Sequence, residues 1–206
     1  VRVEDSADVS PASLTLEGWF RFYSTQGNQT LMAKANDSSF SYKVWYDGTS
    51  LRGAVGGEFG LETGLEEEWT PEIGVWYHIA FTYDATTFEE ALYINGVEVD
   101  SDESDVEEIE YDAESPFTIG AEEVDETPGS FLFGMADEVR IWSVARTDIA
   151  DRMNGIIDDP VNEANLNAYY PFNETSGSTT DDATGNGNDG TLEGSPMFFP
   201  STAPIS

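Results

Sequence analysis

The chain has 206 residues, and its 41 acidic against 8 basic side chains leave a formal net charge of −33. This balance excludes nucleic-acid binding, because no basic patch is available to displace the counterions of a phosphate backbone. The absence of cysteine excludes disulfides, and no apolar run reaches the roughly 18 residues that cross a membrane.

Short segments that alternate apolar and polar residues recur along the chain and predict an all-β fold. In the segment LTLEGWFRF, every second residue from Leu14 shares one face, and most of these residues are leucine or phenylalanine. Strands are expected, in chain order, at Val1–Glu4, Leu14–Tyr23, Thr30–Lys34, Phe40–Tyr46, Ser50–Val55, Trp76–Tyr83, Glu90–Ile94, Val97–Asp100, Pro116–Ile119, Ser130–Trp142, Leu166–Phe172 and Gly190–Phe199.

Local signals mark one turn and one helix in this series. Asn95-Gly96 supplies the positive φ angles of a tight type I′ turn, so the strands on either side are expected to form a hairpin. One short helix is expected around Thr147–Asn154, with Thr147 or Ser143 as its cap and Gly155 at its end.

Acidic residues dominate two stretches, Glu66–Glu68 and Asp100–Glu114, which are expected to be solvated loops or edge strands. The high net charge predicts adaptation to a salty medium. At about 0.1 M salt the Debye length is about 10 Å and self-repulsion is considerable, whereas at about 1 M it falls to about 3 Å. An acidic marine or calcium-rich extracellular protein is the alternative.

The length suits one domain with a full core. We expect a single domain over residues 1–206, with the main sandwich at 1–155, closing strands at 166–199 and a frayed tail at 200–206. The chain starts directly at the strand-like segment VRVE, which suggests a domain excised from a longer protein.

Several motifs in this order resemble laminin G-like domains of the concanavalin A-like lectin/glucanase superfamily, of the pentraxin-related type found in microbial surface proteins. The motifs are GWFRF, LMAKAND, YKVWYDGTSLRGAVGG, WYHIAFTYD, LYINGVEV, FTIGAE and FLFGMADEVRIWSVARTDIADRM. The resemblance covers the chain from Val1 to about Asn154, and WYHIA and DEVRIW are its more specific parts. It implies an antiparallel β-sandwich jelly roll, a structural calcium ion, and a role in adhesion or sugar binding.

Two candidate calcium sites follow. The resemblance assigns calcium to Asp137, because the matching aspartate in several superfamily members ligates a structural calcium; alternatively, Asp137 hydrogen-bonds a turn. The second candidate is the loop DDATGNGND, which is rich in the oxygen ligands that calcium prefers but lacks EF-hand spacing. Its candidate ligands are Asp181, Asp182, Asn186, Asn188 and Asp189, and a glycine-rich turn closed by Asx side chains explains the loop equally well.

Candidate ligand-binding residues combine an aromatic platform with polar neighbours near turns. They are Trp69, Trp45, Tyr46, Asn36 and Asp37. The alternative is that a tryptophan near the end of a strand packs under a loop.

Catalysis is not expected. Glu103, Asp105 and Glu107 alternate as in the superfamily's glucanases, but Ser104 departs from that pattern and a chain this acidic produces such spacing by chance. The single histidine, His78, lies in an apolar strand and is interpreted as structural, since no cysteine or second histidine could complete a zinc site with it.

The sequence thus predicts a non-catalytic extracellular or cell-surface module that contacts glycans or cell-surface glycoproteins within a larger parent chain. The sequons at Asn28, Asn36 and Asn173 permit that location. Two alternatives stay open, namely a structural spacer domain and an accessory carbohydrate-binding domain of a polysaccharide-degrading enzyme.

Overall fold

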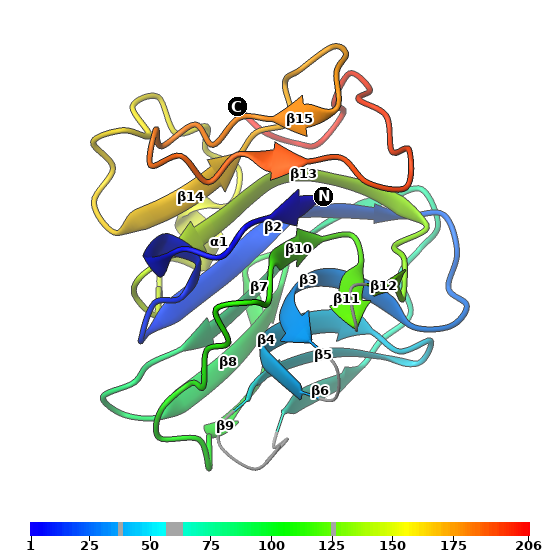
Figure 1. Ribbon diagram of the computed structural model, residues 1–206. Helices are drawn as coiled ribbons and strands as arrows, with labels where there is room; N and C mark the ends of the chain where they lie inside the picture. The colour runs from blue at the N-terminus through cyan, green and yellow to red at the C-terminus, as the bar shows by residue number, and fades with distance from the viewer. Residues whose placement is uncertain (37–38, 57–63, 125–126) are drawn as a thin grey trace.

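The computed structural model describes residues 1–36, 39–56, 64–124 and 127–206. Within these ranges two antiparallel sheets, one of six and one of eight strands, face each other as a β-sandwich (Figure 1). This architecture confirms the predicted all-β fold.

The six-stranded sheet has the order β14-β13-β2-β7-β8-β9. Its strands are β2 (Leu14–Phe22), β7 (Trp76–Tyr83), β8 (Glu89–Ile94), β9 (Val97–Glu103), β13 (Gly134–Trp142) and β14 (Leu166–Tyr170). Period-two alternation places the apolar residues of β2 and β7 on one face, so this sheet was largely predictable from the sequence.

The eight-stranded sheet has the order β15-β16-β1-β10-β3-β4-β5-β6, and a separate hairpin, β11–β12, lies against β3 (Figure 1). The strands of the sheet are β1 (Arg2–Val3), β3 (Gln29–Asn36), β4 (Ser39–Tyr46), β5 (Ser50–Val55), β6 (Leu65–Glu68), β10 (Phe117–Ile119), β15 (Thr179–Thr180) and β16 (Gly190–Thr191). The hairpin consists of β11 (Glu122–Val124) and β12 (Thr127–Gly129). The acidic segment at β6 is therefore an edge strand.

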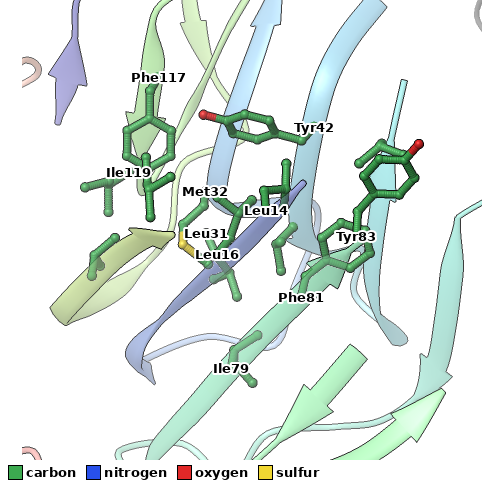
Figure 2. Close-up of a cluster of buried hydrophobic side chains, with 14 of the residues drawn as sticks. Leu14, Leu16, Leu31, Met32, Tyr42, Ile79, Phe81, Tyr83, Phe117 and Ile119 are labelled. Atoms are coloured by element: carbon green, nitrogen blue, oxygen red, sulfur yellow. The ribbon is translucent and has the colours of Figure 1, made fainter. Parts of the chain in front are cut away.

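The core fills the space between the sheets. Figure 2 shows side chains of β2 and β7, such as Leu16 and Phe81, pointing towards Met32 and Tyr42 of the opposite sheet, and all four are fully buried. The sheets approach closely at Gly53, where an added Cβ would lie 2.5 Å from the Phe81 ring. A larger residue at position 53 would force the layers apart.

The Asn95-Gly96 turn forms as predicted, with φ angles of 51° and 75°. The helix is shorter than predicted: α1 covers Ile149–Arg152, and Asp148, not Thr147 or Ser143, occupies the N-cap position without a side-chain cap bond. A Cβ at Gly96 would lie 2.6 Å from Ala150 Cα, so α1 rests directly on the hairpin turn. Among the described residues, no helix has the length and apolar character needed to traverse a bilayer.

A layer of buried polar residues lies on the outer face of the six-stranded sheet, under the segment that joins β13 to β14. Glu17 accepts a hydrogen bond from Trp142 Nε1 at 2.8 Å, and one of its oxygens lies 3.3 Å from His78 Nε2. Arg140 binds Glu138 at 2.7 Å and the carbonyl of Gly155 at 2.6 Å. These bonds fasten the connecting segment to the sheet, and His78 has the structural position expected from the sequence.

The C-terminal region divides between the two sheets. Strand β14 extends the six-stranded sheet, whereas β15 and β16 extend the eight-stranded sheet beside β1, and no strand is assigned beyond Thr191. The tail expected to be frayed is hydrogen-bonded to the domain: Ser201 binds Asp137, Thr202 accepts from Trp76 Nε1 at 3.0 Å, and the Ser206 amide binds the Asn154 carbonyl.

Candidate functional site

The candidate site lies on the outer face of the eight-stranded sheet and is centred on Trp45. In β4, Tyr42, Val44 and Tyr46 are fully buried and point into the core. Alternation therefore directs Lys43 and Trp45 to the opposite face, where both are half-buried. The sequence folds this way because β4 carries its apolar residues at even positions.

Lys43 and its acidic partner flank one side of the Trp45 ring. The Lys43 ammonium lies 5.1 Å from the ring centre, a cation–π geometry, and forms an ion pair with Glu122 of β11. Burial alone would raise the pKa of Glu122, but the hydrogen bonds from Lys43 and Ser130 outweigh burial and lower it. Glu122 is therefore an ionised hydrogen-bond acceptor beside the ring.

Arg52 lies on the same sheet face as Trp45, because the two residues are direct cross-strand partners. Arg52 Nε lies 2.6 Å from Asp47, and Arg52 Nη2 lies 2.7 Å from Glu66 of β6. Asp47 also accepts hydrogen bonds from the backbone amides of Thr49 and Ser50, both at 2.9 Å. Burial would raise the pKa of Asp47, but these bonds and that from Arg52 hold it well below its usual value.

We call Glu122, Lys43, Trp45, Arg52 and Glu66 the Trp45 row. The row combines a half-buried aromatic ring with two ion pairs. The charged groups of these pairs have further hydrogen-bond donors and acceptors that a polar ligand could use. An aromatic face with a few convergent polar groups is the usual composition of a small-molecule site. The four charged side chains are held in place by their ion pairs, Lys43 with Glu122 and Arg52 with Glu66.

Sequence reasoning found Trp45 but missed the other members of the row. Lys43 could have been found, because it is one of two lysines in the chain and alternates with Trp45 along one strand. Glu122 could not have been found, since it reaches the site from a hairpin 79 residues away.

The other predicted ligand-binding residues do not join the row. Tyr46 is fully buried, which removes it from the surface. Trp69 is half-buried and packs edge-on against the core residues Phe22 and Tyr46 and against Tyr77, with its ring centre 4.9 Å from that of Tyr77. Asn36 ends β3, opposite Ser39, and Asp37 lies outside the described residues.

In the loop at 181–189, Asp182 is the centre of a hydrogen-bond network. One oxygen accepts from the amides of Tyr169 and Thr184 and from the Thr184 hydroxyl, at 3.1, 3.0 and 2.7 Å. The other accepts from the amide and side chain of Asn188, at 3.3 and 3.0 Å. Both oxygens of Asp182 therefore accept hydrogen bonds that hold the loop together.

The remaining predicted ligands of this loop are arranged around that network. Asp189 accepts a bond from the Asp182 amide at 2.9 Å, and Asn186 donates to the Asn167 carbonyl at 3.0 Å. Asn188 is buried, and Asp181 is exposed with only its amide bonded, to Glu174. The loop therefore has the geometry of an Asx-closed turn, the alternative left open by the sequence.

Asp137 is buried next to a bulge in β13, and its carboxylate accepts bonds from the Glu138 amide at 3.0 Å and from Ser201. Burial is the main cause that raises its pKa to about 6. Across the described ranges, no three His, Cys, Asp or Glu side chains converge as a metal-binding group. Calcium also takes amide, backbone and water oxygens, so calcium binding at Asp137 or in the loop stays a prediction.

The alternating acids of the glucanase-like pattern are not assembled as a catalytic pair. Glu103 is the last residue of β9, and Asp105 and Glu107 follow it outside any strand. All three are exposed at the edge of the sandwich, whereas Ser104 and Val106 between them are buried. Their geometry supports a solvated acidic segment.

Comparison with solved structures shows the same fold in several carbohydrate-binding and pentraxin proteins. A proposed carbohydrate-binding protein from Bacteroides ovatus is similar over 93% of this chain, with a TM-score of 0.74 and 23% identity, and the chain spans 57% of that protein's length. The CBM40 of the Ruminococcus gnavus IT-sialidase, solved with α2,3-sialyllactose, matches 69% of this chain and 82% of its own, with a TM-score of 0.58 and 14% identity. A heptameric SAP-like pentraxin from Limulus polyphemus matches 68% of this chain and 72% of its own, with a TM-score of 0.53 and 18% identity.

A comparison with curated proteins gave no match. The laminin G type 3 family model, described as the concanavalin A-like lectin/glucanases superfamily, matches residues 1–149. The match covers the strands of both sheets up to β13 and ends at the first residue of α1. The chain therefore belongs to the laminin G-like family of the concanavalin A-like lectin/glucanase superfamily.

Proposed function

We propose that this domain is a non-catalytic carbohydrate-binding module that binds neutral sugars at the Trp45 row. The observation that carries the proposal is the half-buried Trp45 side chain on an outer sheet face, with Lys43 over its ring and Arg52 as its cross-strand neighbour. The descriptions of two structures of similar fold, as a carbohydrate-binding protein and as a CBM40, support it.

The row supplies the two interactions that a sugar ring requires. The apolar C–H face of a sugar stacks on the indole, and its hydroxyls exchange hydrogen bonds with the flanking charged groups. Lys43 and Arg52 are each neutralised by a carboxylate partner, so the row offers no excess positive charge and suits an uncharged ligand. The ion pairs also hold these long side chains in place before binding, which reduces the entropy lost on association.

We place the domain outside the cell or on its surface, where it contacts glycans or glycoproteins as part of a larger chain. An accessory role in a carbohydrate-active enzyme is the second candidate, and the similarity to a CBM40 of a sialidase favours it. A spacer domain without a ligand is the remaining alternative, and it predicts that loss of Trp45 has no effect on any binding.

The proposal is tested on a glycan array probed in high salt, with and without calcium. Wild-type protein is expected to bind a set of neutral oligosaccharides, and Trp45→Ala is expected to lose that set. Phe199→Ala is the matched control, because Phe199 is also an exposed aromatic but belongs to the C-terminal segment. Absence of binding by the wild-type protein, or equal binding by Trp45→Ala, contradicts the proposal.

A further inference from the structure

Arg21 is the one basic residue without a carboxylate partner in the part of the chain that the structure describes. The other seven basic residues each form at least one ion pair there; they are Arg2, Lys34, Lys43, Arg52, Arg140, Arg146 and Arg152. In a chain with 41 acidic residues, a cation with no such partner requires an explanation.

Arg21 points to the outer face of the six-stranded sheet, on the side of the sandwich opposite the Trp45 row. Its cross-strand partners on β13 and β7 are Met135 and Trp76. Its guanidinium carbon lies 5.5 Å from the centre of the Tyr23 ring, two residues along β2. The charge is therefore framed by apolar and aromatic side chains.

The aromatic side chains beside Arg21 are unusually exposed. Tyr23 is 41% exposed and Phe133 is 64% exposed, and their ring centres lie 6.3 Å apart in an edge-to-face arrangement. The Tyr23 hydroxyl donates to the sulfur of Met135 at 2.9 Å, which orients the ring. We call Arg21, Tyr23, Trp76, Phe133 and Met135 the Arg21 corner.

Among the described residues, the guanidinium of Arg21 has an unsatisfied donor. Its Nε is buried and has no hydrogen-bond partner there, a state that costs free energy unless a ligand supplies an acceptor. The backbone of Gly74, with φ of 83°, passes beside the guanidinium, and even a Cβ there would lie 3.6 Å from Nη2. No side chain at position 74 therefore covers the guanidinium.

We propose that the Arg21 corner is a second binding site, and that its ligand is a sugar that carries a carboxylate. The inference rests on the proposed carbohydrate-binding function. A guanidinium binds a carboxylate through paired, charge-assisted hydrogen bonds, and the exposed rings of Tyr23 and Phe133 provide the surface on which the sugar face stacks.

The charge distribution separates the two sites by ligand class. A net charge of −33 repels anionic ligands over the whole surface, so an acidic sugar needs a cation that no protein carboxylate has already neutralised. Arg21 meets this condition, whereas Lys43 and Arg52 of the Trp45 row do not. The long-range repulsion is screened at about 1 M salt, where the Debye length is about 3 Å, so binding is best measured there.

The test is calorimetric titration in high salt with two pairs of probes that differ in the carboxylate. These are 3′-sialyllactose with lactose, and trigalacturonic acid with its methyl ester. Wild-type protein is expected to bind at least one acidic member more tightly than its uncharged counterpart. Arg21→Gln is expected to weaken that binding at least tenfold, whereas Arg152→Gln, which makes the same charge change at an exposed site, leaves it unchanged.

Two further variants distinguish the possible outcomes. Arg21→Lys keeps the charge but loses the paired donors, and is expected to show intermediate affinity. Trp45→Ala is expected to bind the acidic sugar normally.

The inference is overturned if folded Arg21→Gln binds the acidic sugar as well as wild type, or if the acidic probes bind no better than the uncharged ones. Self-association through Tyr23 and Phe133 without sugar binding also overturns it. Loss of neutral-sugar binding alone would instead count against the Trp45 row.

Discussion

The Lys43 ammonium lies 5.1 Å from the centre of the Trp45 ring, yet the carboxylate that pairs with Lys43 belongs to Glu122, 79 residues further along the chain. The β11–β12 hairpin therefore holds one side of the Trp45 row in place. Its contribution to binding can be separated from its contribution to stability.

We expect Glu122→Gln to weaken neutral-sugar binding about three- to tenfold, because Lys43 loses the charge that orients it over the ring. Stability should fall by about 1–2 kcal/mol, because the ion pair is largely shielded from solvent and Glu122 also binds Ser130. Glu123→Gln is the matched control, since Glu123 lies on the same strand but pairs with Arg2. Equal loss of affinity in both variants, measured by titration, would argue against a specific role for Glu122.

Asp182 is expected to stabilise the loop at 181–189 through its hydrogen bonds. Asp182→Ala removes an acceptor of five hydrogen bonds and should cost about 2–4 kcal/mol in urea denaturation at neutral pH. Asp181→Ala, at the exposed neighbouring position, should change stability by less than about 0.5 kcal/mol. The same variant tests the calcium prediction: a fall in the melting temperature with EDTA that is absent in Asp182→Ala would show that the loop binds calcium, whereas no change with EDTA would argue against it.

Glu17 is expected to be one of the most sensitive positions in the chain. Burial would raise its pKa, but the hydrogen bond to His78 and the charges of Arg140 and Arg146 outweigh burial and lower it to about 2. Glu17→Gln leaves these cations without their shared counter-charge and should destabilise the fold by about 3–5 kcal/mol. A chemical denaturation series with Glu68→Gln, an exposed acid on an edge strand, provides the comparison. A loss no greater than that of Glu68→Gln would mean that the buried network contributes little.

Glu90 should make the domain less stable as the pH rises. Burial raises its pKa to about 7, partly opposed by the hydrogen bond with Ser104. The folded-state pKa lies above the unfolded value near 4.5, so the folded protein favours the protonated form of Glu90. The stability linked to that protonated form is fully present below about pH 4.5 and is lost as the pH rises through about 7.

The matched variants test that sign. Glu90→Gln is expected to be more stable than wild type by up to about 3 kcal/mol at pH 8, and similar to it at pH 5. Glu89→Gln, at the exposed neighbouring position, should follow the wild-type pH curve. A Glu90→Gln protein that is less stable than wild type at pH 8 would mean that hydrogen bonding, not desolvation, dominates at this site.

Salt is expected to stabilise the domain, since its net charge of −33 is spread over 9606 Å² of surface. Raising NaCl from about 0.1 M to about 3 M should increase the melting temperature as self-repulsion is screened. An uncharged osmolyte at equal osmolality serves as the control. Equal stability at both salt concentrations would refute the prediction of adaptation to a salty habitat.

Local signals in the sequence predicted most of the fold. Strands such as Ser50–Val55 and Trp76–Tyr83 were predicted to the residue, because alternation and flanking turns define them without reference to the rest of the chain. The helix was predicted too long, since its length depends on how α1 rests on the turn at Gly96. The short strands β11, β12 and β15 were missed, because long-range pairing defines them and their composition does not.

The site was predictable only in part. An alternating strand shows that Lys43 and Trp45 share a face, but not that Glu122 approaches them. Tyr46 was grouped with Trp45, but neighbouring residues of a strand point to opposite faces, so alternation sends Tyr46 into the core with Tyr42 and Val44. That Arg21 has no acidic partner in the described ranges could not be inferred from a chain in which one residue in five is acidic.

Sugar binding at Trp45 is tested most directly by a calorimetric titration of the best neutral oligosaccharide from the array into wild-type, Trp45→Ala and Phe199→Ala proteins. We expect saturable binding to wild type and Phe199→Ala, and at least a tenfold weaker interaction with folded Trp45→Ala. Undiminished affinity in Trp45→Ala would show that the outer face of the eight-stranded sheet is not the neutral-sugar site.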